Sequence, residues 1–275
     1  MTDMLETTAA SPDMTRSARA NPRDIREAAR QQRFKQDFVA DTPAWYRGEL
    51  HLAFNVLLPV GVIAWCVSQM QSPSPAVWLL VLPVALLGNW IEWAAHRYIL
   101  HRPLPGLKMI YKRHCSVHHQ FFTHHDLGFS GHREWRALLF PPFAPAGFIV
   151  AAIPPALLLG WLVSPNAGYV VEITIAAYYL LYEGLHTLSH FDNEDYPWLA
   201  HMPLVNTVRR MHRIHHVLGF MQTRNFNLTF PICDALFATS DLDRGLVGTL
   251  FNGESDTYVR RDLRPDPEAP QNETV

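Results

Sequence analysis

Histidine is unusually frequent in this chain of 275 residues, which contains fifteen imidazoles but only 17% charged residues. Ten of the histidines fall into four short clusters, HRYILH, HCSVHH, HTLSH and HRIHH. Neutral imidazole is a common ligand for iron, zinc and copper, and ten such ligands exceed the four that one tetrahedral zinc ion takes. The clusters therefore predict a site for two metal ions. Its predicted ligands are His96, His101, His114, His118, His119, His186, His190, His212, His215 and His216.

The spacing within the clusters indicates how the imidazoles can converge. Residues three or four apart share one face of an α-helix, as they do in HTLSH and HRIHH and nearly do in HCSVHH, which has one extra residue. His96 and His101 are five apart, which separates them by about 140° on a continuous α-helix. We therefore expect the helix to bend or end between them, and RPLPG directly after His101 supplies helix-breaking residues.

Carboxylates close to the clusters are candidates for orienting the metal ligands. Glu92 and Glu183 each lie about one helical turn before the first histidine of a cluster, and Asp192 follows the third cluster closely. A carboxylate in such a place can accept a hydrogen bond from the far ring nitrogen and fix the tautomer.

The remaining histidines are weaker candidates for metal binding. His124 and His125, in FFTHHDL, either line the site or lie in a loop, and the loop is the favoured interpretation. His51, His132 and His201 are solitary, so we expect no metal-binding role for them. Cys115 lies inside the second cluster, where we interpret it as a packing residue.

Four apolar segments must position these clusters. Each is close to the ~20 residues that span the ~30 Å hydrocarbon core of a bilayer, and the third contains prolines that membrane helices tolerate. The turns between the first and second segments and between the third and fourth carry no charge. The sequence thus predicts two transmembrane hairpins, and the alternative is a soluble all-helical protein with a large core. The segments cover residues 52–69, 76–95, 138–163 and 169–185.

Basic residues predict the orientation of the hairpins. The N-terminal leader is rich in arginine, and so is the loop between the second and third segments. Short loops rich in Lys and Arg stay in the cytoplasm, so both hairpins enter from the cytoplasmic side. Every histidine cluster lies at or just beyond the end of a segment and is therefore expected on that side.

These features predict an all-α integral membrane protein. We expect a transmembrane bundle of four helices with a cytoplasmic, histidine-rich helical cap. We expect residues 1–45 to form a polar, arginine-rich and partly disordered cytoplasmic leader with a short surface helix over 22–38, residues 46–245 to form the membrane domain, and residues 246–275 to form a polar tail. The formal net charge of -2 argues against nucleic acid as a partner, and the three widely spaced cysteines form no disulfide framework.

The ordered motifs resemble the fatty acid hydroxylase / sterol desaturase superfamily of membrane non-haem di-metal oxygenases. The resemblance runs from about Gly88 to Thr239 and rests on HRYILHRP, HCSVHH, RALLFPP, YEGLHTLSH and HRIHH followed by NFNLTFPICDALFAT. The motifs HRYILHRP and RALLFPP look most like those of fatty acid and sphingolipid hydroxylases. The second cluster has three residues before its paired histidines where the fatty acid hydroxylases usually have two, and related desaturase-type oxygenases share this longer spacing.

The resemblance implies a function. The ten clustered histidines would hold two iron ions, which zinc replaces in some isolated members, and the enzyme would hydroxylate an alkyl C–H bond of a lipid with O2. A desaturase or hydroxylase of another lipid, a sterol or a carotenoid is the alternative. Because the leader and the tail contain no visible cytochrome b5 module, electrons would come from a separate ferredoxin or cytochrome b5 type protein. The membrane would be a bacterial inner membrane or the endoplasmic reticulum.

Two non-enzymatic functions fit the sequence less well. A metal transporter places ionisable ligands midway through its membrane segments, whereas these clusters lie at the ends of the segments. A bis-histidine haem protein needs only one imidazole on each side of the porphyrin, and ten clustered imidazoles exceed that need.

Overall fold

The computed structural model describes residues 22–191 and 195–263. Over these residues the chain is helical, with two isolated β-bridges and no β-strand. In chain order the elements are α1 Pro22–Asp41, α2 Gly48–Gln69, η1 Pro75–Leu80, α3 Val81–Ala95, η2 His96–Leu100, α4 Lys108–Tyr111, η3 Lys112–His118, α5 His119–Phe121, α6 Trp135–Leu138, α7 Phe143–Leu162, α8 Pro165–Ser189, η4 Pro197–His201, α9 Pro203–His215, α10 Ile232–Leu236, α11 Leu246–Leu250 and η5 Arg261–Leu263.

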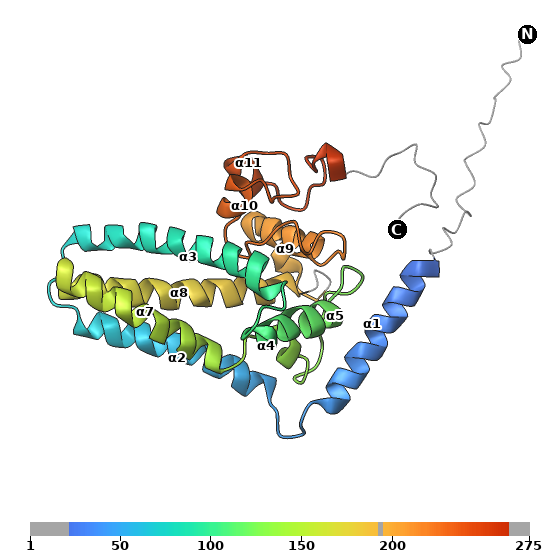
Figure 1. Cartoon of the computed structure of the whole chain (residues 1–275), viewed down its shortest axis with the longest axis horizontal. Helices are drawn as coiled ribbons and strands as arrows, with labels where there is room; N and C mark the ends of the chain where they lie inside the picture. The colour runs from blue at the N-terminus through green and yellow to red at the C-terminus, as the bar shows by residue number, and fades with distance from the viewer. Residues whose placement is uncertain (1–21, 192–194, 264–275) are drawn as a thin grey trace, which may run out of the picture.

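The four longest helices that follow α1 along the chain form a bundle. α2, α3, α7 and α8 lie side by side, and α4, α5, α9, α10 and α11 gather at one end of them as a cap (Figure 1). Three stretches are long and apolar enough to cross a membrane: Gly48–Gln69, Pro75–Leu100 and Trp135–Leu162. The protein is therefore an all-helical integral membrane protein, as the sequence predicts.

α8 covers the fourth predicted segment but is not one of these three stretches. It carries two glutamates, Glu172 and Glu183, and both are buried in the bundle together with Thr174. α8 therefore resembles a core helix that the other three surround, which explains why its composition is more polar. The structure supports three spans by length and composition, and a fourth remains a prediction.

The outer surface of the bundle is apolar. Trp65, Leu82, Leu157 and Trp161 have exposed side chains on the three apolar helices. Large apolar side chains exposed in such numbers along one body indicate contact with lipid, because soluble proteins rarely expose extended apolar patches.

Small residues bring α7 and α8 into close contact. A Cβ atom on Gly168 would lie 2.6 Å from the carbonyl oxygen of Ala156, so only glycine fits at this position. Gly160 lies against the same part of α8. Membrane helices use small residues in this way to let their backbones approach. The uncharged turns are also joined, because Asn166 exchanges hydrogen bonds of 2.8 and 3.1 Å with the backbone of Gln71.

α1 packs against the cap and matches the surface helix predicted for residues 22–38, extended to Asp41. Phe34 and Phe38 contact a small core that includes Phe121 and Phe122. The N-terminal leader is thus attached to the histidine-rich end of the molecule from residue 22 onward.

The C-terminal region folds back further than the sequence suggests. Within the predicted tail, Val259 forms a β-bridge with Leu242, and Asp256 pairs with the buried Arg210 of α9 at 2.7 Å. Arg210 also pairs with Asp241 at 2.9 Å. Residues 246–263 therefore belong to the packed cap, and residues 264–275 lie outside the described part of the chain.

Candidate metal centre

The ten clustered histidines converge in the structure on one place at the end of the bundle. Nine of their ligand nitrogens form two buried groups, and within each group all ligand atoms lie within 4.8 Å of one another. His216 joins the second group, because its Nε2 lies 3.0 Å from Nε2 of His212. The groups adjoin through His119 and His216, whose ring centroids are 4.3 Å apart. The first group is His96, His101, His114, His119 and His215, and the second is His118, His186, His190 and His212.

A π-helical turn brings the first cluster together. The helix continues beyond α3 as the π-helix η2 and ends at Leu100. Hydrogen bonds in a π-helix join residues five apart, so His96 and His101 reach the same side, with ring centroids 5.1 Å apart. The helix thus ends between the two histidines, as one of the two expected alternatives, but a change of helical pitch rather than a bend brings their rings together.

The second and fourth clusters each contribute ligands to both groups. In the π-helix η3 and the adjoining α5, His114 and His119, five apart, face the first group, and His118 faces the second. On α9, His215 contributes to the first group and His212 to the second. The spacing indicated that the rings of each of these two clusters could share one face, but the structure divides them between the two groups.

Backbone carbonyls fix the tautomer of five of the ten rings. A carbonyl oxygen can only accept a hydrogen bond, so the ring nitrogen facing it carries the proton and the other nitrogen keeps a free lone pair. In each case the protonated nitrogen is Nδ1, and Nε2 points into the centre. The pairs are His96 with Phe226 at 2.6 Å, His118 with Ala137 at 3.2 Å, His190 with Leu127 at 2.9 Å, His215 with Arg224 at 2.8 Å and His216 with Phe122 at 2.6 Å.

The Nε2 atoms face one another at the centre. Nε2 of His114 lies 3.0–3.1 Å from Nε2 of His96, His101 and His119. Nε2 of His212 lies 2.9 Å from that of His190. One nitrogen can donate at most one proton, so most of these close contacts cannot be hydrogen bonds.

A bound cation would account for these short separations. Two ligand nitrogens about 2.1 Å from a common ion and at right angles to each other are about 3.0 Å apart, which matches the separations of 2.9–3.1 Å seen here. The donor set of neutral imidazoles suits iron and zinc. The residues present therefore fit one ion in each group.

Burial keeps the ligands in the state that a metal requires. Removal from water, together with the neighbouring imidazoles, lowers the pKa of His101 to about 2 and that of His118 to about 3. The pKa of His212 and that of His215 also lie well below the usual value for histidine for the same reasons. These rings are neutral at physiological pH, and metal binding needs no proton release from them.

A sequence model of the fatty acid hydroxylase family matches residues 81–239 of this chain. That region includes all ten histidines and more than half of the chain. The chain belongs to the fatty acid hydroxylase family. No curated protein and no solved structure matches the chain. Membership in the family indicates an oxidoreductase of the hydroxylase or desaturase type, with lipid as the class of substrate.

Glu92 does not orient its neighbouring histidine directly. Its carboxylate accepts hydrogen bonds from the backbone amides of Leu228 and Thr229, from the Thr229 hydroxyl at 2.7 Å and from the Tyr178 hydroxyl at 2.5 Å. The carbonyl that holds His96 belongs to the same segment, at Phe226. Glu92 therefore supports the ligand indirectly, by fixing the backbone that carries its hydrogen-bond acceptor.

Glu183 has a similar structural role. It accepts hydrogen bonds from Asn55 Nδ2 at 3.0 Å and from the backbone amide of Phe140 at 3.1 Å. Phe140 directly precedes the two prolines at the start of α7, so Glu183 fixes the start of that helix. The third predicted carboxylate, Asp192, lies outside the described residues.

Cys115 is closer to the centre than the packing interpretation implied. Its Sγ atom lies 3.2 Å from Nδ1 of His101 and 3.4 Å from the carbonyl oxygen of Leu100. Burial raises the pKa of this thiol to about 12, so it stays protonated. Cys115 is therefore the partner of the His101 ring in the place that a carbonyl takes for five other ligands.

The orienting carbonyls were missed by sequence reasoning because every residue has one. The motif NFNLTFPICDALFAT contains a recognisable signal, since Asp234 accepts hydrogen bonds from the amides of Phe226 and Asn227 at 3.0 and 2.8 Å. This turn also places the Phe226 ring against the first group, with its centroid 5.7 Å from that of His96.

The five remaining histidines lie outside both groups. His51 is a satisfied core histidine, bonded to the Tyr46 hydroxyl and the Phe140 carbonyl at 2.7 Å each. His132 and His201 are not among the gathered rings. His124 and His125 lie in an exposed turn after α5, as the favoured interpretation predicted.

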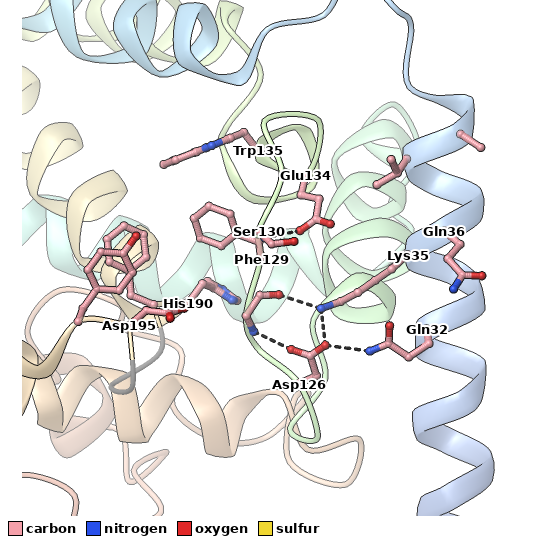
Figure 2. A pocket seen from close by; sticks show the side chains of 15 residues that line it. Gln32, Lys35, Gln36, Asp126, Phe129, Ser130, Glu134, Trp135, His190 and Asp195 are labelled. Carbon is pink, nitrogen blue, oxygen red and sulfur yellow. Dashed lines mark hydrogen bonds and ion pairs between the residues drawn. The ribbon is translucent and has the colours of Figure 1, made fainter.

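A cavity of about 790 Å³ reaches the second group. It lies between α1, the segment 126–135 and the residues just after α8, and His190 is among its lining side chains (Figure 2). The aromatic rings of Phe129, Trp135 and Tyr196 share its wall with polar groups such as Gln32. The cavity therefore offers a polar and aromatic approach to one candidate ligand.

Proposed function

We propose that this protein hydroxylates an alkyl C–H bond of a lipid, using O2 and two iron ions held by the ten histidines. The observation that carries the proposal is the pair of adjoining buried imidazole groups at one end of a membrane bundle, with Nε2 atoms about 3 Å apart. Family membership indicates the reaction class, and the histidines would provide the ligands of the redox-active metal.

The first group would hold one ion and the second group, with His216, the other. Iron in these ligands supplies the one-electron chemistry that O2 activation and attack on a saturated C–H bond require, which zinc cannot supply because it has no redox activity.

The protein orients the ligands and keeps water away from them. The carbonyls that accept hydrogen bonds from Nδ1 hold the rings in place, and hydrogen bonds of this kind also raise the basicity of a ligating Nε2. Phe122 and Phe226 cover the imidazoles, with the Phe122 centroid 4.1 Å from that of His190. An apolar cover of this kind favours reaction with a lipid chain over loss of oxidant to water.

We further propose that α8 crosses the membrane with the three apolar stretches and that the cap is cytoplasmic. The basic loop between Pro75–Leu100 and Trp135–Leu162 lies at the same end as the histidines, and the opposite turns are uncharged. A bacterial inner membrane or the endoplasmic reticulum satisfies this orientation.

The lipid would enter laterally from the bilayer, where its alkyl chain is already dissolved. Electrons would come from an external ferredoxin or cytochrome b5 type protein, which can approach from the cytoplasm.

Lipid mass spectrometry with isotopically labelled dioxygen tests this function. Cells that make the wild-type chain should contain a lipid with one labelled oxygen atom, and cells that make His186→Ala should lack it because the second group loses a ligand. The control is His201→Ala, which removes an exposed histidine outside both groups and should behave like the wild type. A product that has lost two hydrogens without gaining the label would assign desaturation instead, and identical lipids in all strains would contradict the proposal.

A further inference from the structure

We propose that Glu27, His124 and His125 form a third, exchangeable site for a divalent transition-metal ion, which bridges α1 and the turn after α5. One ligand atom from each residue lies within 4.8 Å of the other two. Nε2 of His125 is 3.3 Å from a carboxylate oxygen of Glu27, and the two imidazole centroids are 3.9 Å apart. All three side chains are exposed, in contrast to the buried centre.

Backbone hydrogen bonds define the turn that presents the two histidines. Thr123 and Asp126 exchange backbone hydrogen bonds of 3.2 and 3.1 Å across it, which places His124 and His125 at its tip. The tight turn brings the two neighbouring rings together, with their centroids 3.9 Å apart.

One face of α1 holds this turn. Glu27, Gln31 and Lys35 are four residues apart and share a helix face. Gln31 donates to the carbonyls of Phe121 and Asp126 at 2.8 and 2.6 Å. Lys35 donates to the Asp126 carboxylate at 2.6 Å, a contact visible in Figure 2. These contacts fix the register of α1 so that Glu27 faces the two histidines.

The donor set defines the class of ion. Two imidazoles and one carboxylate suit Zn²⁺, Ni²⁺ and Cu²⁺ better than Mg²⁺ or Ca²⁺, which prefer oxygen ligands. Three protein ligands leave positions for water, and exposure to solvent makes the ion exchangeable. Without an ion, the same residues form only a surface contact between Glu27 and His125, which contributes little to stability.

An ion at this site would act on the buried centre through the backbone. The segment 122–127 supplies the Phe122 carbonyl to His216 at 2.6 Å and the Leu127 carbonyl to His190 at 2.9 Å. Fixing the turn against α1 would therefore fix two of the carbonyls that orient candidate ligands. This consequence rests on the proposed function, whereas ion binding at the outer site does not.

Zinc binding to the full-length protein in detergent tests the site. The protein is first loaded with iron and washed with a chelator, then dialysed against Zn²⁺ at graded concentrations, and bound zinc is counted by elemental mass spectrometry. The wild type should bind one more zinc per chain than His124→Ala/His125→Ala. Glu27→Gln, which replaces the anionic ligand by a neutral amide, should raise the half-saturating zinc concentration about tenfold or more, equivalent to about 1.4 kcal/mol.

His201→Ala is the matched control, because it removes one exposed histidine from another part of the cap, and it should bind zinc like the wild type. Bound iron is measured in the same samples. Retention of iron with loss of the extra zinc in the double variant supports the outer site whether or not the enzyme is active. Equal zinc binding by the wild type and the double variant would overturn the proposal.

Discussion

At the scale of single residues, the metal centre depends on what lies behind each imidazole. Five rings are held by carbonyl oxygens through Nδ1, and His101 instead meets the thiol of Cys115 at 3.2 Å. Partners of this kind typically change metal affinity 10–100-fold, roughly, when they are removed. Cys115 is the member of this set that a side-chain substitution can remove.

We predict that Cys115→Ala lowers the affinity of the first group for its ion about 10-fold, because Nδ1 of His101 loses its partner. Cys115→Ser should retain affinity close to that of the wild type, since a hydroxyl also accepts a hydrogen bond from Nδ1. Competition with a chromophoric chelator measures both values. Equal affinities for the alanine variant and the wild type would show that the thiol only packs against the ring.

At the scale of elements, the π-helical segments η2 and η3 are the features that the sequence did not predict. The ten histidines, the apolar helices and the family were all evident from residue types and order. The two π-turns were not, because a spacing of five on an assumed α-helix places His96 and His101 about 140° apart. The division of the second cluster, HCSVHH, between the two groups depends on the same local widening of the helix in η3.

The indirect roles of Glu92 and Glu183 could not be predicted for a different reason. Their distance from the histidines along the chain was read correctly, but each carboxylate is taken by backbone amides from a segment distant in sequence. Long-range backbone contacts of this type leave no local sequence pattern. Asp234, inside the motif NFNLTFPICDALFAT, differs because it accepts hydrogen bonds from the nearby amides of Phe226 and Asn227.

The contact between α7 and α8 gives a prediction for the bundle. Gly168→Ala should destabilise the protein by about 1–3 kcal/mol, because the new methyl group collides with the Ala156 carbonyl and the helices must separate. Gly61→Ala is the control, since no atom lies within 4 Å of a Cβ at that position of α2. Unfolding of both variants in detergent, followed by circular dichroism, compares them. Equal stability of the two variants would refute the close contact.

At the scale of the whole molecule, the cap concentrates neutral imidazoles in one buried volume, and this makes the metal-free protein sensitive to acid. Burial lowers the pKa of His101 to about 2 and that of His118 to about 3, from an ordinary value of 6.5. Below pH 6.5 these histidines are protonated in the unfolded chain but stay neutral in the folded chain. Acid therefore favours the unfolded state.

We predict that the midpoint of thermal unfolding of the metal-free protein falls as the pH is lowered from about 7 to about 5. Each such histidine contributes up to about 1.4 kcal/mol per pH unit in this range. The metal-loaded protein should resist the same change until protons displace the ions. A midpoint that is constant over this range for the metal-free protein would contradict the buried, neutral state of the rings.

The division of ten histidines into two adjoining metal sites is the central claim, and counting ions in the iron-loaded, chelator-washed protein tests it most directly. The wild type should retain two ions per chain. His215→Ala, which alters the first group, and His212→Ala, which alters the second, should each retain about one, and the double variant none. A wild-type protein that holds a single ion, or a double variant that keeps both, would contradict the account.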